Sequence, residues 1–238
     1  MANLTGDDRS RYVQNVFTRI APRYDLMNRL MTGGQDLRWR REVIRRARLF
    51  PGDRLLDLGA GTGDLSREAL RQQPEAHVLA ADFTLEMMRV GKGAFSPMLP
   101  LTWSAADALH LPFGDQAFEA VISGFLMRNV ADVPLALAEQ FRVLKDGGRL
   151  VILDTTRPRR NLLSPFTWLH MHVVIPLLGT LVSGQRDAYT YLPDSTEHFL
   201  YAEQLAGQLA KAGFTNIGFH RLMLGTIAIH SAEKPKNQ

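Results

Sequence analysis

The sequence predicts an α/β fold in which a mostly parallel, seven-stranded sheet ends in an antiparallel hairpin. Short apolar runs alternate with helical stretches from residue 54 to residue 212, as in repeated strand–helix–strand units. The last two runs, 215–220 and 223–230, lie too close together for a connecting helix, so we expect them to pair antiparallel. A glycine-rich turn after the first run marks the usual ligand position in such folds.

The first fifty residues are predicted to form helices that precede the sheet. Apolar side chains recur at helical spacing in residues 13–20, and a second helix is expected to begin near Tyr24, after Pro22. A third helix is expected from Asp36, as its N-cap, to Leu49.

The remaining elements alternate in the order that a parallel sheet requires. Strands are expected at residues 54–58, 77–81, 101–104, 118–123, 149–153, 215–220 and 223–230. Helices are expected at residues 63–73, 84–92, 132–144 and 201–212. Glycines 147–148 and 213 are predicted to end the last two of these helices.

A length of 238 residues suits one domain with additions. We predict a helical cap at residues 1–50, a ligand-binding core at 51–154, a helical insertion at 155–200, and a C-terminal helix and hairpin at 201–238. The insertion is too long for a plain crossover. Its segment 162–182 is apolar enough to suggest a membrane span, but two prolines and two histidines interrupt it. We expect a lid over an apolar ligand, or an insert that only packs.

Composition excludes several classes of protein. The chain is 45% hydrophobic and 22% charged, which places it among globular rather than disordered proteins. The lack of cysteine excludes disulfides, thiolate zinc sites and a cysteine nucleophile, and no metal is expected. The first thirty residues show no signal-peptide pattern, so a cytoplasmic location is expected, with peripheral contact at the inner membrane face left open.

The net charge of +4 is concentrated in two arginine clusters, at residues 38–48 and 157–160. Such clusters meet solvent, anionic lipid or nucleic acid. Trp39 is the one aromatic residue within these two clusters, which is too few for a series of rings that stack on bases, so no nucleic-acid partner is expected.

The turn after the first strand carries the strongest chemical signal. Asp57, Gly59, Gly61 and Gly63 form the pattern D-x-G-x-G-x-G, and Asp82 ends the next strand. A dinucleotide site would need a third glycine at position 64, where an aspartate would repel a pyrophosphate. Acidic groups instead suit a cation, and a carboxylate after the second strand suits ribose hydroxyls. The pattern resembles the first motif of class I methyltransferases, which bind S-adenosylmethionine. A plain tight turn would explain the glycines but not the two acids.

Three further motifs extend the resemblance from about Val13 to His230. They are Tyr24-Asp25-Leu26-Met27-Asn28 followed by Trp39, then Met127-Arg128-Asn129-Val130, and then Arg142 to Leu150. Together they resemble the ubiquinone/menaquinone biosynthesis C-methyltransferases, whose fold is the class I methyltransferase (Rossmann-like) sheet. The chain departs from the family pattern at Thr32, Asp36 and Asp146, where the family has serine, histidine and proline. These departures leave the exact quinone open.

The resemblance implies a donor site that binds S-adenosylmethionine. Its expected residues are Asp57, Gly59, Gly61 and Thr62 at the turn, Asp82 and Phe83 at the ribose, Asp107 and Ala108 at the adenine, and Ser123, or Gly124 instead, at the methionine part. A carboxylate at Asp107 can accept from the adenine amine. The alternative for Asp107 is a helix N-cap.

The resemblance also implies methylation of a ring carbon in a prenylated quinol. A ring hydroxyl has a pKa of ~10 and must lose its proton before the carbon becomes nucleophilic. Arg128 is expected to hold the developing oxyanion and Asn129 to orient it, while Asp25, His170 or His172 accepts the proton. The alternative for Arg128 is a salt bridge under the lid.

Other functions remain open at this stage. The chain can be a methyltransferase for another lipid or small aromatic compound, or a non-catalytic donor-binding subunit of a biosynthetic complex. A nucleic-acid methyltransferase is disfavoured, because residues 123–126 do not follow the Asn/Asp-Pro-Pro-Tyr pattern that methylates an amino nitrogen. The expected partners are a prenylated quinol, an anionic membrane surface contacted by Arg157, Arg159 and Arg160, and a second copy of the chain in a homodimer.

Overall fold

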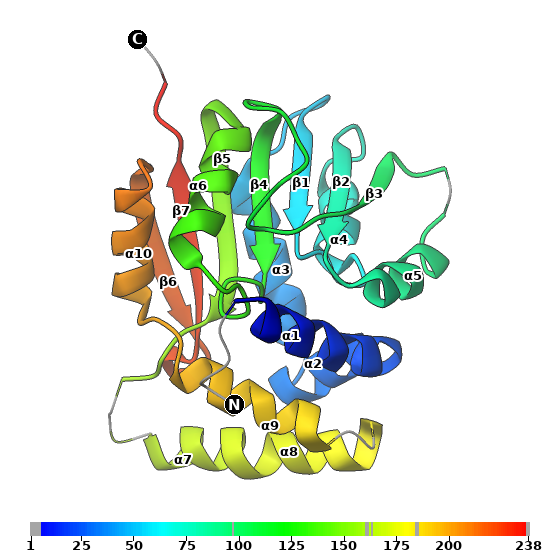
Figure 1. Cartoon of the computed structure of the whole chain (residues 1–238), viewed down its shortest axis with the longest axis vertical. Helices are drawn as coiled ribbons and strands as arrows, with labels where there is room; N and C mark the ends of the chain where they lie inside the picture. The colour runs from blue at the N-terminus through cyan, green and yellow to red at the C-terminus, as the bar shows by residue number, and fades with distance from the viewer. Residues whose placement is uncertain (1–5, 97, 160–161, 163, 184–185, 237–238) are drawn as a thin grey trace.

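A computed structural model describes residues 6–96, 98–159, 162, 164–183 and 186–236. Its centre is a seven-stranded sheet with the order β3-β2-β1-β4-β5-β7-β6 (Figure 1). The strands are β1 (Arg54–Leu58), β2 (His77–Asp82), β3 (Leu101–Ala105), β4 (Phe118–Gly124), β5 (Leu144–Thr155), β6 (Thr215–Leu222) and β7 (Ile227–Glu233). The pairs among β1 to β5 are parallel, while β7 pairs antiparallel with both β5 and β6, which confirms the predicted mostly parallel sheet with a terminal hairpin.

Helices cover both faces of the sheet, because alternate strand residues point to opposite sides. Leu55 packs with α3 (Asp36–Ala47) and α4 (Asp64–Gln72). Its neighbour Leu56 lies in a separate core with α6 (Val133–Val143) and α10 (Ala202–Lys211). Helix α5 (Leu85–Gly93) packs beside β2 and α1. This arrangement leaves the carboxyl ends of the parallel strands free for a site.

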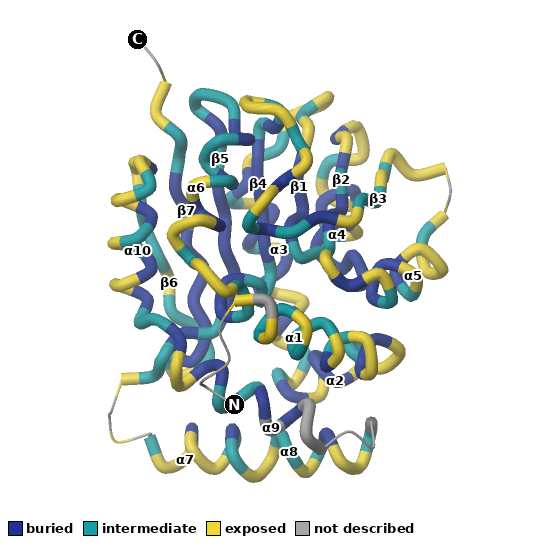
Figure 2. Tube along the Cα trace, viewed as in Figure 1, coloured by how far each residue is buried: buried dark blue, intermediate teal, exposed yellow. Residues whose placement is uncertain are grey.

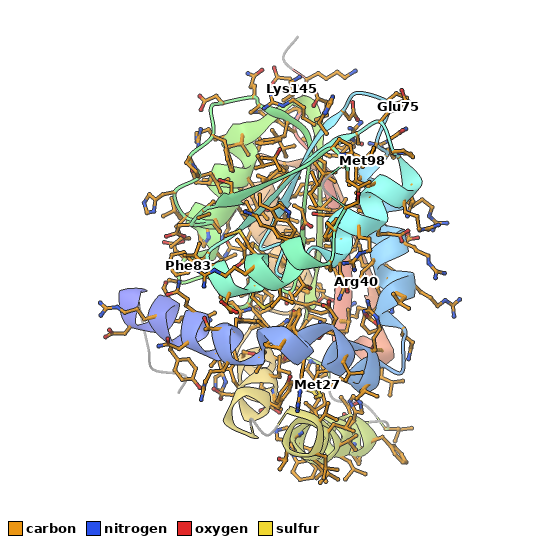
Figure 3. The ribbon with its side chains drawn as sticks, turned by 90° about the vertical axis from the view of Figure 1, so that its right-hand side faces the viewer. Met27, Arg40, Glu75, Phe83, Met98 and Lys145 are labelled. Carbon is orange, nitrogen blue, oxygen red and sulfur yellow. The ribbon has the colours of Figure 1, made fainter. Side chains whose placement is uncertain are left out.

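A helical cap lies across those carboxyl ends (Figure 1). It consists of α1 (Gly6–Ile20), η1 (Ala21–Arg23), α2 (Tyr24–Thr32), α7 (Ser164–Leu169), η2 (His170–Val174), α8 (Ile175–Leu178), η3 (Gly179–Ser183) and α9 (Arg186–Glu197). Val16, Ile20, Met27 and Met31 form its core with Tyr189 of α9. Met27 lies on the side of α2 that faces the lid helices (Figure 3). The N-terminal helices and the insertion therefore close the same end of the sheet.

The lid helix, residues 164–183, buries only one side. Ile175, Leu178 and Val182 pack on the cap core. The opposite side exposes a stripe of large apolar side chains at spacings of three and four residues: Phe166, Leu169, Val173, Leu177 and Leu181. Ser164–Val182 is long and apolar enough to cross a membrane by length and composition, and 17% of its most apolar window is buried. Figure 2 shows this exposure along α7 and α8.

Three local predictions are wrong. Glycines 147–148 do not end a helix, since α6 stops at Val143 and β5 already begins at Leu144. They continue the strand because Gly148 and Gly147 exchange backbone hydrogen bonds with Lys234. The final strand begins at Ile227 rather than at residue 223, because residues 223–225 form a tight turn. Asp36 is the first residue of α3 rather than its N-cap, and its buried carboxylate pairs with Arg40 and Arg29.

Candidate active site

The turn after β1 is fixed by Asp82. Gly59 and Gly61 adopt positive φ angles of 68° and 59°, which glycine tolerates without strain. The Gly61 N–H donates to Asp82 Oδ2 at 2.8 Å, and the Thr84 N–H donates to Oδ1 at 2.7 Å. Burial raises the pKa of Asp82, while these backbone donors favour the charged form. Both oxygens keep further lone pairs for a ligand.

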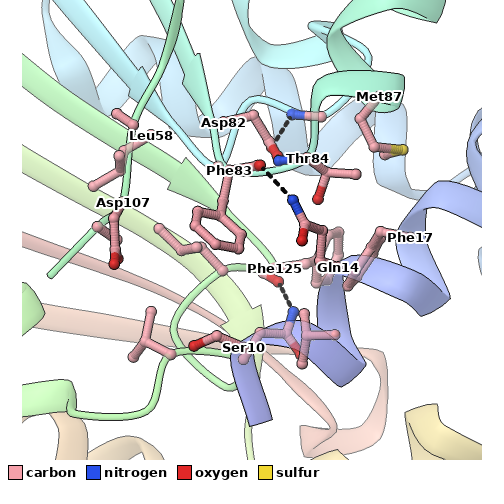
Figure 4. A pocket seen from close by; sticks show the side chains of 18 of the residues that line it. Ser10, Gln14, Phe17, Leu58, Asp82, Phe83, Thr84, Met87, Asp107 and Phe125 are labelled. Atoms are coloured by element: carbon pink, nitrogen blue, oxygen red, sulfur yellow. Dashed lines mark hydrogen bonds between the residues drawn. The ribbon is translucent and has the colours of Figure 1, made fainter. Parts of the chain in front are cut away.

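A cleft opens beside this turn. It is lined by Ser10, Val13, Gln14, Phe17, Tyr24, Leu58, Gly59, Gly61, Asp82, Phe83, Thr84, Met87, Ala106, Asp107, Ala108, Leu109, Gly124, Phe125, Leu126, Asn129, Val130 and Ala131. In the view of Figure 4 the Phe83 ring lies between the side chains of Asp82 and Asp107. The Leu109 N–H donates to Asp107 Oδ1 at 2.9 Å, and a turn closed by His110 follows instead of the helix of the N-cap alternative.

The cleft fits S-adenosylmethionine. Its two carboxylates stand at separate positions and can accept from ribose hydroxyls and from an adenine amine, as Asp82 and Asp107 were expected to do. Phe83 is 45% exposed and offers an apolar face between them, and Ala108 lines the same wall. Gly59 and Gly61 bring the backbone to the edge of the cleft.

Asp57 does not line the cleft. Its side chain is fully buried, and the Ser66 hydroxyl donates to Oδ2 at 2.6 Å. Burial raises the pKa of Asp57 to about 6. The expected direct contact of Asp57 with the donor is therefore corrected: the carboxylate links β1 to α4 beneath the turn.

Asp64 also does not line the cleft, because its carboxylate pairs with arginines. Arg29 and Arg67 each donate to its carboxylate at 2.7 Å, and Arg40 lies 3.4 Å from it. Burial alone would raise the pKa of Asp64, but these arginines together hold it below its ordinary value. The prediction that Asp57 and Asp64 present acidic groups to a cationic ligand is therefore wrong. The carboxylates that line the cleft are those of Asp82 and Asp107, and Asp64 joins the cap to the core.

Thr62 and Asp25 are brought together, but neither is among the residues that line the cleft. The Thr62 hydroxyl donates to Asp25 Oδ1 at 2.6 Å. Burial, with repulsion from Asp64, raises the pKa of Asp25. Their geometry corrects the expected direct roles, because the pair ties α2 to the glycine turn. Ser123 is fully buried as well, and Gly124 takes its place in the cleft wall.

A second cavity lies under the lid. It is lined by Asn28, Met31, Thr32, Phe125, Arg128, Thr155, His170, Met171, Ile175, Leu192, Pro193, Thr196, Met223, Thr226 and Ile227. Phe125 lines both this cavity and the donor cleft. Its φ angle of 60° lies in the left-handed region, an outlier of the kind that clusters at functional sites. Phe125 therefore forms the partition between the two spaces.

Two roles were predicted for Arg128, a salt bridge under the lid or a group that holds an oxyanion, and its position is compatible with both. Its Nη1 donates to Asp154 Oδ1 at 2.9 Å, and the two side chains are 3% and 1% exposed. Burial raises the pKa of Asp154, and the Arg128 guanidinium partly offsets this effect. The same guanidinium lines the lid cavity and lies 5.2 Å from the centre of the Phe125 ring. Arg128 is a buried ion-pair partner and a cavity group at once.

Asn129 lines the donor cleft instead of the lid cavity. Its Nδ2 donates to the Phe125 carbonyl at 2.9 Å, and its Oδ1 accepts from the Tyr191 hydroxyl at 2.9 Å. Burial raises the pKa of Tyr191, so the phenol remains a donor. The amide fixes the turn that carries Phe125 and Arg128, rather than pointing freely at a substrate.

Sequence reasoning missed the contribution of α1 and of Phe125. Gln14 Nε2 donates to the Phe83 carbonyl at 3.2 Å, and Ser10 and Phe17 face the same cleft (Figure 4). The helical spacing of α1 showed an apolar side but not what it covers. Tyr24, in contrast, was already part of a recognised motif and could have been assigned to the cleft.

The sheet order, the glycine turn and the two cleft carboxylates define a class I, S-adenosylmethionine-dependent methyltransferase. The chain belongs to the ubiE/COQ5 methyltransferase family, whose model matches residues 5–234. A ubiquinone/menaquinone biosynthesis C-methyltransferase UbiE from Desulfotalea psychrophila is 45% identical over 92% of this chain and 88% of its own length. A demethylmenaquinone methyltransferase from Thermus thermophilus is 42% identical over 92% of this chain and 100% of its own length.

Solved structures show the same fold at low identity. Phosphoethanolamine N-methyltransferase 2 of Haemonchus contortus, in complex with S-adenosylhomocysteine, superposes with a TM-score of 0.65 at 17% identity, covering 84% of this chain and 53% of that one. The cyclase SpnF superposes with a TM-score of 0.69 at 18% identity, covering 94% and 96%. The fold alone thus accommodates several reactions, and the site must decide among them.

Proposed function

We propose that this chain transfers a methyl group from S-adenosylmethionine to a ring carbon of a polyprenyl quinol. The observation that carries the proposal is the pair of cavities that meet at Phe125. One holds two carboxylates suited to the donor, and the other is a largely apolar space whose lining includes a single guanidinium. The family and the names of the curated relatives support a quinol over another lipid or a small aromatic compound.

Arg128 is the chain's own contribution to the chemistry in this proposal. The bound donor supplies an electrophilic methyl group. A ring oxygen that loses its proton becomes negative, and a buried guanidinium beside it lowers the energy of that charge. Asp154 keeps Arg128 in place, and Asn129 fixes the backbone turn that carries it. Asp25 acts through Thr62 on the glycine turn rather than on the ring.

A direct assay tests the proposal and separates it from a donor-binding subunit without activity. Purified chain, S-adenosylmethionine and chemically reduced demethylmenaquinone should yield one methylated product, detected by mass spectrometry. Cells that lack the chain should accumulate one desmethyl quinone. Donor binding without methyl transfer to any quinol would refute the proposed activity and favour the subunit.

The lid also supports peripheral contact with a membrane, although not through the arginines expected from the sequence. Arg157 donates to the Glu197 carbonyl and covers the Tyr201 ring. Arg159 pairs with Glu203, and Arg160 lies outside the described residues. The exposed stripe of the lid helix offers an apolar surface instead, as in helices that lie in the plane of a membrane interface. A prenyl tail would enter from this side.

Co-sedimentation with vesicles at low and high salt distinguishes these modes. Each buried leucine contributes about 1.5–3 kcal/mol, so we expect binding that high salt does not abolish. Replacing Leu177 and Leu181 by Gln should weaken binding, while Met98→Gln, at a side chain 92% exposed elsewhere, should not. Salt-sensitive binding would refute the apolar mode. A dimer that dissociates in the Leu177/Leu181 variant, without vesicle binding, would show that a second copy covers the stripe.

A further inference from the structure

The cavity under the lid contains polar groups that no described residue satisfies. Asn28 is 7% exposed and Arg128 is 3% exposed, yet Asn28 Nδ2 and Arg128 Nε have no hydrogen-bond partner within the described chain. Thr155 Oγ1 is buried as well, and none of the described residues forms a hydrogen bond with it. The Asn28 amide lies near the Tyr24 hydroxyl and partly offsets the rise in the pKa of Tyr24 that burial causes. Its Nδ2, however, does not have the distance and angle of a hydrogen bond to any described residue. Unpaired buried donors are costly, so their presence indicates a ligand that pairs with them.

The rest of the cavity specifies the shape of that ligand. Met31, Met171, Ile175 and Leu192 supply apolar surface from the N-terminal cap, the lid and α9, and Phe125 separates the space from the donor cleft. A flat apolar ring with an oxygen at one edge satisfies both the apolar surface and the unpaired donors. A charged or sugar-like ligand would leave most of this surface poorly matched.

The two lid histidines differ in their surroundings. His172 Nδ1 lies 3.1 Å from the Trp168 carbonyl, its Nε2 lies 3.2 Å from Glu197, and its ring stacks on Trp168. The His170 ring lines the cavity and has no hydrogen-bond partner in the described part of the chain, where the backbone carbonyl of His170, not its ring, accepts from the Ile175 N–H. His170 is therefore the lid histidine with a ring nitrogen free to meet a ligand.

We propose that the cavity binds the hydroxylated ring of the aromatic acceptor, with Asn28 and Arg128 donating to one ring oxygen and His170 accepting its proton. This inference rests on the proposed function and names the acceptor site within it. The step breaks the ring O–H bond: the proton moves to the imidazole, and the electron pair stays on oxygen, where it activates the neighbouring ring carbon. That carbon would form its bond to the methyl group as the donor's sulfur–methyl bond breaks and its electron pair stays on sulfur. The carbon then releases its own hydrogen as a proton to solvent, and the proton held by the imidazole returns to the ring oxygen, so the aromatic ring and its hydroxyl are restored.

His170→Ala with added imidazole tests the proton acceptor. General-base catalysis contributes about 10²–10⁴-fold, so turnover of a reduced, short-tailed demethylmenaquinone should fall by at least about 10²-fold. Free imidazole should restore part of this loss in proportion to its concentration. His172→Ala, two residues away on the same helix, is the matched control and should show neither effect. Calorimetric titration with the donor should give wild-type affinity for both variants.

Asn28→Leu tests the oxygen-binding donors without relying on the lid. Loss of one donor to a developing anion should reduce kcat by about 10²–10³-fold with donor affinity retained. The inference is overturned if folded His170→Ala turns over normally or ignores imidazole, or if Asn28→Leu keeps its kcat. Failure of the proposed function gives a different result: the wild-type chain itself would then methylate no quinol, whereas failure of this inference leaves wild-type activity intact and affects only the expected losses in the variants.

Discussion

Asp57 allows the most quantitative prediction from this structure. Its carboxylate is fully buried under the glycine turn, with Ser66 as its side-chain donor and with Oδ1 unpaired among the described residues. Burial raises its pKa from the ordinary 3.8 to about 6, and the Ser66 hydrogen bonds only partly oppose this effect. The folded chain therefore binds a proton at Asp57 more tightly than the unfolded chain does.

The sign of the effect on stability follows from proton linkage. Because the pKa is raised on folding, the stabilisation from Asp57 is fully present below pH 3.8 and is lost as the pH rises through about 6. The difference between these values is equivalent to about 3 kcal/mol. Asp57→Asn can still accept from Ser66 but never ionises. Its free energy of unfolding, relative to wild type, should thus increase by about 3 kcal/mol from acid to neutral pH.

Urea unfolding of both proteins at about pH 4, 6 and 8 measures this difference, since titration of other groups is common to both. Asp64→Asn is the control of opposite sign. The pKa of Asp64 is held low by Arg40 and its neighbours, so this variant should lose stability at neutral pH and less of it in acid. A pH-independent difference between Asp57→Asn and wild type would refute the reasoning. A large loss of donor affinity in the folded variant would show that Asp57 contacts the donor.

Three further outcomes are expected. Asp82→Ala should weaken donor binding, measured by calorimetry, by about 10²-fold or more, because charge-assisted hydrogen bonds contribute about 1.5–3 kcal/mol each; unchanged affinity in a folded variant would exclude the ribose contact. Arg128→Lys keeps the charge but loses the planar fork, so turnover should fall steeply while donor affinity stays the same, and normal turnover of Arg128→Ala would contradict its role. Tyr191→Phe removes the hydrogen bond to Asn129 and should lower the free energy of unfolding by about 0.5–1.5 kcal/mol; a thermal melt identical to wild type would show that this bond contributes nothing.

Much of the donor site was predictable because its parts are close in sequence. The glycine turn directly follows β1, and Asp82 ends the strand that pairs with β1 in parallel register. Parallel neighbours end at the same edge, so the turn and Asp82 had to meet. Asp107 follows β3, the next strand outward, by the same logic. Asp57 was misassigned because it lies inside β1, where its side chain points into the α3–α4 side of the sheet, toward Ser66.

The lid cavity was not predictable in this way. Arg128 follows β4 and pairs with Asp154 near the end of the neighbouring strand, β5. Asn28, Thr155 and His170 come from three segments that are distant in sequence. Periodicity identified the apolar side of each helix but not the surface that covers it. The same limit applied to Arg157 and Arg159, whose partners lie in α9 and α10.

The sequence by itself determined the class of fold, the family and the glycine turn at the edge of the candidate donor cleft, because alternating strands and helices, the turn and the motif residues are local patterns. Tertiary structure alone decided which carboxylates face the cleft, that Arg128 serves an ion pair and a cavity together, and that one lid histidine faces inward while the other pairs at the surface. The physical reason is that burial and pairing depend on groups brought together from distant parts of the chain. A side chain's charge state and its access to a ligand are therefore properties of the packed molecule.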